Sequence, residues 1–273
     1  MRRVVLAFAL ILGAAQVARA HDMFWTLTSW FVAPNSDVRL FVLNGTFSKT
    51  ENSIGWERVA DLSVVSPAGR ATIDSAHWET KTDTSVLRYT TAAPGTYVTG
   101  LSTKPRELAQ KAADFNTYLK DDGIPDIIAD RTTKGQLGQD ARERYHKHVK
   151  AIIQVGDART DGWKTVLGYP AELVPLANPY TLKPGATLAF RCLVDGKPAA
   201  HQLVMVGGRS GAVGDARLPS VSLRSDADGI VRVQLTRAGR WYVKFIHMTR
   251  IDDGAVNYES KWASLTFEVR ERR

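Results

Sequence analysis

Cysteine is almost absent from the sequence, because Cys192 is the single one among 273 residues. One cysteine cannot form a disulfide within the chain in any compartment, so the fold must be stabilised by core burial. Cys192 stands in an apolar run with strand character, where a small buried side chain is expected rather than a nucleophile. A paired C-x-x-C motif for zinc binding or disulfide exchange is therefore excluded.

Long apolar runs and basic clusters are scarce as well. After residue 20, no run approaches the roughly 20 apolar residues that a membrane-spanning helix needs, so no span is expected in the mature chain. The net charge of +8 is spread along the chain, with acidic residues between the basic ones. This pattern lacks the basic face of a nucleic-acid-binding protein, and we expect no nucleic-acid partner.

The familiar enzyme signatures are missing too. The sequence has no G-x-S-x-G nucleophile elbow, no phosphate-binding G-x-x-x-x-G-K-[ST] loop and no H-E-x-x-H zinc motif. The acidic stretch "SDADG" lacks the further ligands of a calcium loop and is typical of a hairpin turn. We therefore predict that the protein is not an enzyme, with no catalytic residues and no residues that bind an organic cofactor.

A secretory leader is present in residues 1–20. Arg2 and Arg3 form its positive start, residues 4–15 form an apolar middle, and residues 18–20 read Ala-Arg-Ala, a small-x-small cleavage site. Cleavage after this site removes three arginines, which lowers the net charge from +8 to +5. It also leaves His21 as the first residue of an exported protein.

The mature sequence has two β-rich blocks on either side of a stretch with helical periodicity. In both blocks, short runs with strand character are separated by turn pairs such as Asn44-Gly45 and Asp195-Gly196. Short strands at regular spacing predict a mainly β protein with two related sandwich units. We assign residues 21–168 to the first unit and residues 169–273 to the second.

The sequence predicts a helical segment over about residues 105–152, between the two β-rich blocks. From Leu108 to Leu119, apolar residues recur at positions i, i+4, i+7 and i+11, which places them on one face of a helix. A second helix is predicted over residues 139–155 from a similar apolar stripe. We expect both helices to pack on the first sandwich or to bridge the two units.

The candidates for metal binding are the six histidines, His21, His77, His146, His148, His201 and His247. After cleavage, His21 would offer its α-amine and its ring nitrogen, which close a six-membered chelate around an ion. The reference pKa of such an amine, about 7.7, is low enough for a metal to displace the proton. One more imidazole would complete a near-planar set of three nitrogens, which copper(II) and nickel(II) favour.

We predict His247 as the second metal ligand, because it stands at the end of a predicted strand where side chains become available. His146 and His148 fall in the second predicted helix, where positions i and i+2 lie about 200° apart around the axis. That spacing predicts a solvated helix surface rather than a metal pair. Two simpler interpretations stay open: His247 as an interface histidine, and His21 as the residue that the signal peptidase leaves.

Several stretches resemble a known protein family. They are "HDMFW" at the mature start, "DFNTYLKDDGI" and "ARERYHKHVKAIIQVGD" in the middle, and "YESKWASLTFEV" near the end. The chain resembles the domain of unknown function 4198 family, whose exported bacterial members are often labelled periplasmic components of nickel or cobalt transport systems. The resemblance implies two immunoglobulin-like β-sandwich units with a helical insertion between them. It also implies a periplasmic accessory to an inner-membrane metal permease.

The sequence thus favours periplasmic binding of a divalent transition metal ion, nickel, cobalt or copper, with His21 and His247 as ligands. The alternative is a metal-free cell-envelope module that binds carbohydrate or protein, with tryptophans lining its surface. A third class, a copper enzyme that uses the same amino-terminal chelate, would need an open coordination position and an adjacent substrate surface. The sequence supports neither of these two features.

Overall fold

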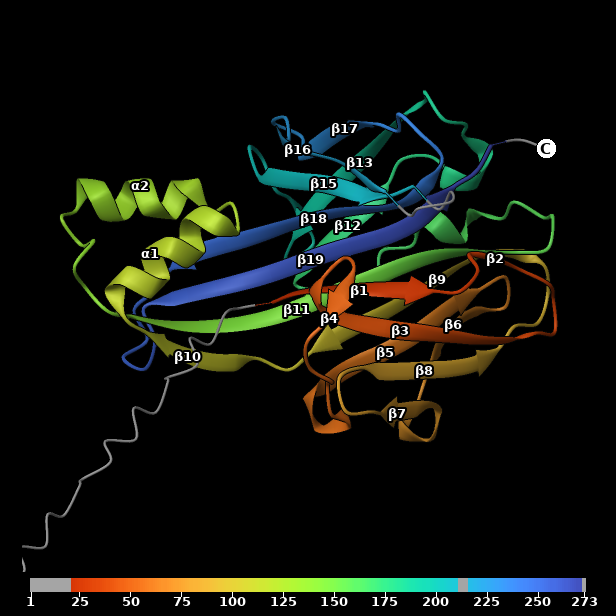
Figure 1. Ribbon diagram of the computed structural model, residues 1–273, viewed down its shortest axis with the longest axis horizontal. Coiled ribbons are helices and arrows are strands. Elements are labelled where there is room, and N and C mark those ends of the chain that lie inside the picture. The colour runs from red at the N-terminus through yellow and green to blue at the C-terminus, as the bar shows by residue number, and fades with distance from the viewer. Residues whose placement is uncertain (1–20, 211–215, 272–273) are drawn as a thin grey trace, which may run out of the picture.

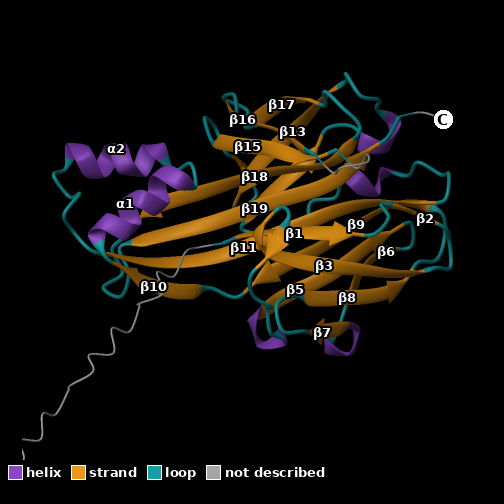
Figure 2. Cartoon of the chain, viewed as in Figure 1, coloured by secondary structure: helices purple, strands orange, loops and turns teal. Residues whose placement is uncertain are grey.

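The computed structural model describes residues 21–210 and 216–271, so the predicted leader lies outside the described residues. The chain is mainly β, as predicted, and its strands form three sheets that lie in layers (Figures 1 and 2). The largest sheet is the middle layer, because its two faces contribute side chains to two different hydrophobic cores. A third, smaller core lies beneath the two helices.

The middle layer is a ten-stranded sheet. Its main path consists of β16 (Arg217–Arg224), β15 (Leu203–Arg209), β18 (Gly239–Arg250), β19 (Tyr258–Val269), β11 (Ala141–Val155), β9 (Gly95–Thr103), β5 (Val59–Ser66) and β6 (Gly69–Thr72). Two further strands pair with β11, namely β10 (Arg106–Gln110) and β2 (Phe31–Val32). The central pair, β11 and β19, runs parallel, so strands far apart in the sequence meet in the middle of the sheet.

A five-stranded sheet covers one face of the middle layer. It consists of β1 (Asp22–Leu27), β3 (Asp37–Thr46), β8 (Ser85–Thr90), β7 (Trp78–Thr80) and β4 (Lys49–Thr50). Trp25 and Leu40 from this sheet pack with Val149 and Ile153 of β11 in one core. The first part of β3 alternates buried and more exposed side chains, as expected for a sheet with one face on the core.

A four-stranded sheet covers the opposite face. It consists of β12 (Ala171–Pro175), β13 (Thr187–Val194), β14 (Lys197–Pro198) and β17 (Ile230–Gln234). Phe190 and Cys192 from this sheet pack with Ile152 of β11 and Leu265 of β19 in the second core. Cys192 is buried, as its apolar surroundings in the sequence predicted.

Two α-helices cover the end of the middle layer that the five-stranded sheet leaves free (Figure 1). They are α1 (Ala112–Asp121) and α2 (Pro125–Thr133), and short 3-10 turns occur elsewhere as η1 (Trp56–Arg58), η2 (Ser75–His77), η3 (Asp161–Lys164) and η4 (Pro179–Thr181). Phe115 and Leu119 of α1 are fully buried against Tyr258 and Trp262 of β19. The first predicted helix is therefore correct for its second half, whereas its start belongs to β10.

The second predicted helix, over residues 139–155, is wrong, because this segment is the long strand β11. Its apolar stripe also suits a strand that is buried on both faces, and its second half is rich in β-branched residues such as Val149, Ile152 and Ile153. Pairing with β19 on one edge and with β9 and β10 on the other decides between the two structures. The helical insertion is thus limited to residues 112–133.

The two faces of β11 belong to different cores, because side chains alternate along a strand. Lys150 points towards the four-stranded sheet, where its Nζ lies 2.7 Å from Oε1 of Glu172, and both side chains are almost fully buried. Glu172 also accepts backbone N–H bonds from Leu167, Gly168 and Tyr169. This ion pair therefore fixes β12 and the segment before it onto β11.

The predicted boundary near residue 168 falls in the segment that Glu172 holds, and the division at this point stays a prediction. Strands from both sides of it share the middle sheet, since residues 143–151 of β11 pair with residues 258–266 of β19. Neither helix in the described ranges, 21–210 and 216–271, is long and apolar enough to cross a membrane.

We expect Glu172→Gln to lower the free energy of unfolding by about 3–5 kcal/mol, because it leaves the Lys150 charge buried without its carboxylate. Urea unfolding at neutral pH measures this change. The matched control is the double variant Lys150→Met with Glu172→Gln, which removes the unpaired charge and should regain part of the loss. Equal stability of the wild type and Glu172→Gln would show that the pair does not hold β12 in place.

Candidate functional site

His21 directly precedes β1, the edge strand of the five-stranded sheet. Its imidazole is a quarter exposed, and its Nε2 lies 3.4 Å from Oε2 of Glu51 in an ion pair. Nδ1 has no hydrogen-bond partner within the described residues. The backbone oxygen of His21 accepts a hydrogen bond from Nζ of Lys147, so the start of β1 is fixed to the middle sheet.

Lys147 reaches this position from β11, on the face opposite to Lys150. It is almost fully buried, and its Nζ also donates to Oδ1 of Asn44 at 3.3 Å and lies 5.2 Å from the ring centroid of Trp262. Burial lowers the pKa of Lys147 to about 8, although the nearby carboxylates of Asp22 and Asp122 act in the opposite direction. A buried lysine therefore supports the residue that precedes β1.

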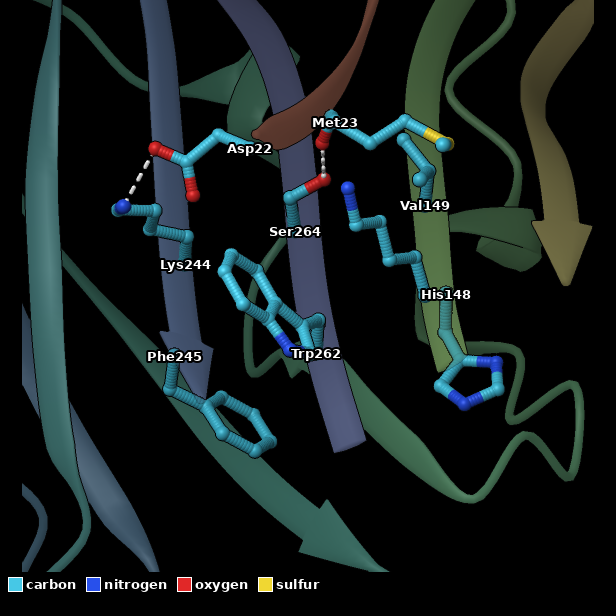
Figure 3. A pocket seen from close by; sticks show the side chains of 10 residues that line it. Asp22, Met23, His148, Val149, Lys244, Phe245, Trp262 and Ser264 are labelled. Atoms are coloured by element: carbon cyan, nitrogen blue, oxygen red, sulfur yellow. Dashed lines mark hydrogen bonds and ion pairs between the residues drawn. The ribbon is translucent and has the colours of Figure 1, made fainter. Parts of the chain in front are cut away.

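A second buried lysine, Lys244 of β18, lines the same small cavity as Lys147. Its Nζ forms a 2.5 Å ion pair with Oδ2 of Asp22, and Ser264 of β19 donates to the backbone oxygen of Met23 at 2.6 Å (Figure 3). Lys147, Lys244 and Ser264 thus tie His21 and the first two residues of β1 to three adjacent strands of the middle sheet. The enclosed space is ≈ 10 Å³, which suits about one water molecule.

Asp122, just after α1, belongs to the same charged group. Its side chain is half-buried, and burial raises its pKa to about 7, with a further rise from Asp22 and an opposing effect from Lys244 and Lys147. Asp122 also lines a larger adjoining cavity of ≈ 350 Å³ with the aromatic residues Phe24, Phe47 and Tyr242, whose ring centroids lie 4.8–5.2 Å apart.

The other predicted ligand, His247, lies on the opposite face of the middle sheet from His21. Lys244 faces β1 through Asp22, so alternation along β18 directs Phe245 and His247 to the other face, where Phe245 joins the second core. Figure 3 shows Phe245 directed away from β1. The structure therefore does not bring His21 and His247 together, and the prediction that they share one ion is corrected.

His247 has other neighbours of its own. Its Nδ1 lies 3.0 Å from Oε1 of Gln202, and burial lowers its pKa. With His201 it lines a cavity of ≈ 360 Å³ between α2 and β15.

His146 and His148 were predicted to lie on a helix surface, but they lie on strand β11. Positions i and i+2 of a strand face the same way, and the two ring centroids lie 4.8 Å apart. Both residues are buried, and burial lowers the pKa of His148 to about 3 and also lowers that of His146. The sequence analysis missed this pair because it assigned the wrong periodicity.

The buried lysines were missed as well, although the sequence carries a signal for Lys244. It stands in the strand-like stretch "WYVKFI", where a single charge among apolar residues indicates a buried ionic contact. In the described residues, no group of three or more His, Cys, Asp or Glu side chains is arranged to hold a metal ion. A metal site here needs other donors as well, such as a free α-amine or water.

These features define a mainly β, layered protein with a buried charged group at its amino-terminal strand. A family model described as "Domain of unknown function (DUF4198)" matches residues 18–249, and the chain belongs to this family. The comparison with curated proteins gave no match.

Two solved structures are distantly similar. The chain is 11% identical to the Escherichia coli alpha-2-macroglobulin structure, with a TM-score of 0.24 over 92% of this chain and 14% of that one. It is also 11% identical to a DUF4785 family protein from Legionella pneumophila, with a TM-score of 0.23 over 85% of this chain and 52% of that one. The chain therefore spans only part of either protein, and these likenesses carry no argument about function.

We expect the ionisation of Asp122 to lower the free energy of unfolding of the wild type as pH rises from about 4 to 7. Its folded pKa of about 7 lies above the ordinary 3.8, so the folded state binds more protons in this window. Asp122→Asn should remove this contribution. The free energy of unfolding of the variant, relative to that of the wild type, should therefore be higher at pH 8 than at pH 4. Urea unfolding at both pH values measures it.

The matched control is Asp157→Asn, which changes an exposed carboxylate in another part of the chain and should keep the wild-type pH dependence. An unchanged pH dependence in Asp122→Asn would show that the Asp122 carboxyl stays charged throughout this range.

Proposed function

We propose that the protein is exported to the periplasm and binds a divalent transition metal ion through the amino-terminal histidine that cleavage after Ala20 exposes. The observation that carries this proposal is the ion pair between Nε2 of His21 and Glu51. It engages the ring nitrogen that is remote from the backbone and leaves Nδ1 unpartnered. Nδ1 is the nitrogen that closes a six-membered chelate with the α-amine.

A carboxylate on the second ring nitrogen is a common feature of histidine metal ligands, because it orients the ring and raises its basicity. Glu51 comes from the segment after β4, and the Thr50 side chain beside it accepts the backbone N–H of Asn44 at 3.3 Å. The carboxylate thus approaches His21 from a neighbouring part of the same sheet.

The fixed position of β1 also supports metal binding. Lys147 holds the carbonyl of His21, and Lys244 holds Asp22, so the chelating residue is ordered before an ion arrives. An ordered chelate loses less conformational entropy on binding than a flexible terminus does. Two nitrogens with water or carboxylate oxygens suit copper(II) or nickel(II), which favour tetragonal sets of nitrogen and oxygen.

The biological role that we propose is that of an accessory to metal uptake or handling, with an inner-membrane permease as partner. We also infer that the three layers represent two immunoglobulin-like sandwiches that share their middle sheet. The two separate cores, one on each face of that sheet, support this interpretation.

The metal-free module is the second candidate, and the cavity of ≈ 350 Å³ beside β1 favours it. Its aromatic lining is Phe24, Phe47 and Tyr242, combined with charged groups such as Asp122 and Lys244. The tryptophans do not support this candidate, because five of the seven are buried, namely Trp25, Trp30, Trp78, Trp241 and Trp262. Binding of soluble glycans that is unaffected by chelators would favour this second function.

We expect the protein cleaved before His21 to bind one equivalent of Cu²⁺ or Ni²⁺ in isothermal titration calorimetry. His21→Ala should abolish this binding, and acetylation of the His21 α-amine should weaken it at least tenfold, since the acetyl group removes the chelating amine but keeps the ring. Glu51→Gln should weaken it by roughly 10-fold to 100-fold.

His247→Gln is the matched control and should keep wild-type affinity, because His247 lies on the other face of the sheet. Equal affinities of the free and the acetylated amino terminus would contradict the amino-terminal chelate, even if metal bound elsewhere.

A further inference from the structure

The face of the middle sheet opposite to His21 carries the buried pair His146 and His148. The side chains of β11 alternate, so Lys147 between them points to His21 while the two imidazoles point to the other side. The ring centroids are 4.8 Å apart, with the planes at 80°. Two imidazoles therefore share one small volume beneath the surface of this face.

Each of these rings has a nitrogen without a partner. The Nε2 atoms of His146 and His148 are both buried and form no hydrogen bond, although the residues are only 8% and 2% exposed. A buried polar atom without a partner destabilises the fold, because it has lost its hydrogen bonds to water and gained none in return. Two such atoms of the same type on adjacent rings point to a shared ligand that accepts electron pairs.

Ser102 of β9 orients the His148 ring for metal binding. Its Oγ lies 2.9 Å from Nδ1 of His148 and is itself buried. When Nδ1 donates its proton to this oxygen, Nε2 of the same ring carries the lone pair. Orientation of a ligating histidine through its other nitrogen is usual in metal sites.

The charges around the pair allow a cation to bind. Lys261 of β19 lies in register with His146, but its Nζ is held by Asp195 at 2.6 Å and by Glu259 at 3.7 Å. The two carboxylates outnumber the single ammonium group at this edge of the site. Ala263, the register neighbour of His148, has only a methyl group and keeps the adjacent position small.

We propose that His146 and His148 bind a second divalent transition metal ion, of the zinc type, through their Nε2 atoms. Imidazole nitrogens suit Zn²⁺, and two protein ligands leave coordination positions for water. His146, the less buried of the two, lies on the side from which the ion enters. This site does not depend on cleavage of the leader or on His21, so it can exist whether or not the amino-terminal chelate forms.

The test uses the full protein carrying His21→Ala, which removes the amino-terminal chelate. Calorimetry with ZnCl₂ should show one equivalent bound, and Co²⁺ should give the visible absorption bands of a nitrogen-bound ion. His146→Gln and His148→Gln should each weaken Zn²⁺ binding at least tenfold and remove these bands. His77→Gln is the matched control, because this histidine is exposed and paired with Asp74 in η2.

Zinc X-ray absorption of the same protein, with His146 and His148 intact, gives a measurement that does not rely on the folding of the glutamine variants. Two imidazole ligands per zinc are expected. The proposal is overturned if no zinc binds, if fewer than two imidazoles are seen, or if both folded glutamine variants retain the affinity of the His77→Gln control.

Discussion

The constraint on which the rest of the structure depends is the alternation of side chains along β11. One strand supplies Val149 and Ile153 to one core and Ile152 to the other, so both outer sheets are packed against the same backbone. The charged residues follow the same rule, since Lys147 faces the five-stranded sheet and Lys150 the four-stranded one. A shift of one residue in the register of β11 would exchange the two faces and leave both lysines in the wrong layer.

The two candidate metal sites are consequences of this alternation. Lys147 orders the amino-terminal strand, whereas its neighbours His146 and His148 form a polar pair on the reverse side. Burial costs free energy for each of these groups, and the lysine recovers part of it through hydrogen bonds while the two Nε2 atoms do not. The sites are therefore on opposite faces of the sheet, although His146, Lys147 and His148 are consecutive residues of β11.

The sequence predicted the β class, many of the turns, the helix around Phe115 and the burial of Cys192, because local patterns carry these features. It could not assign β11, since a strand buried on both faces loses the two-residue period and its apolar stripe also suits a helix. That error changed the interpretation of His146 and His148, whose spacing is unfavourable on a helix and favourable on a strand. The surroundings of His21 come from β3, β11, β18 and the Glu51 segment, and no local pattern links such distant residues.

The position of β19 has a consequence for how the chain acquires its structure. The last strand of the sequence lies between β11 and β18, inside the sheet rather than at its edge. Until residues 258–269 are available, β11 lacks its parallel neighbour, the core under the four-stranded sheet lacks Leu265 and Phe267, and the core beneath the helices lacks Tyr258 and Trp262. The middle sheet therefore cannot close until residues 258–269 have been synthesised. Because long-range parallel pairing forms slowly, a chain truncated before Tyr258 should remain open and prone to aggregation.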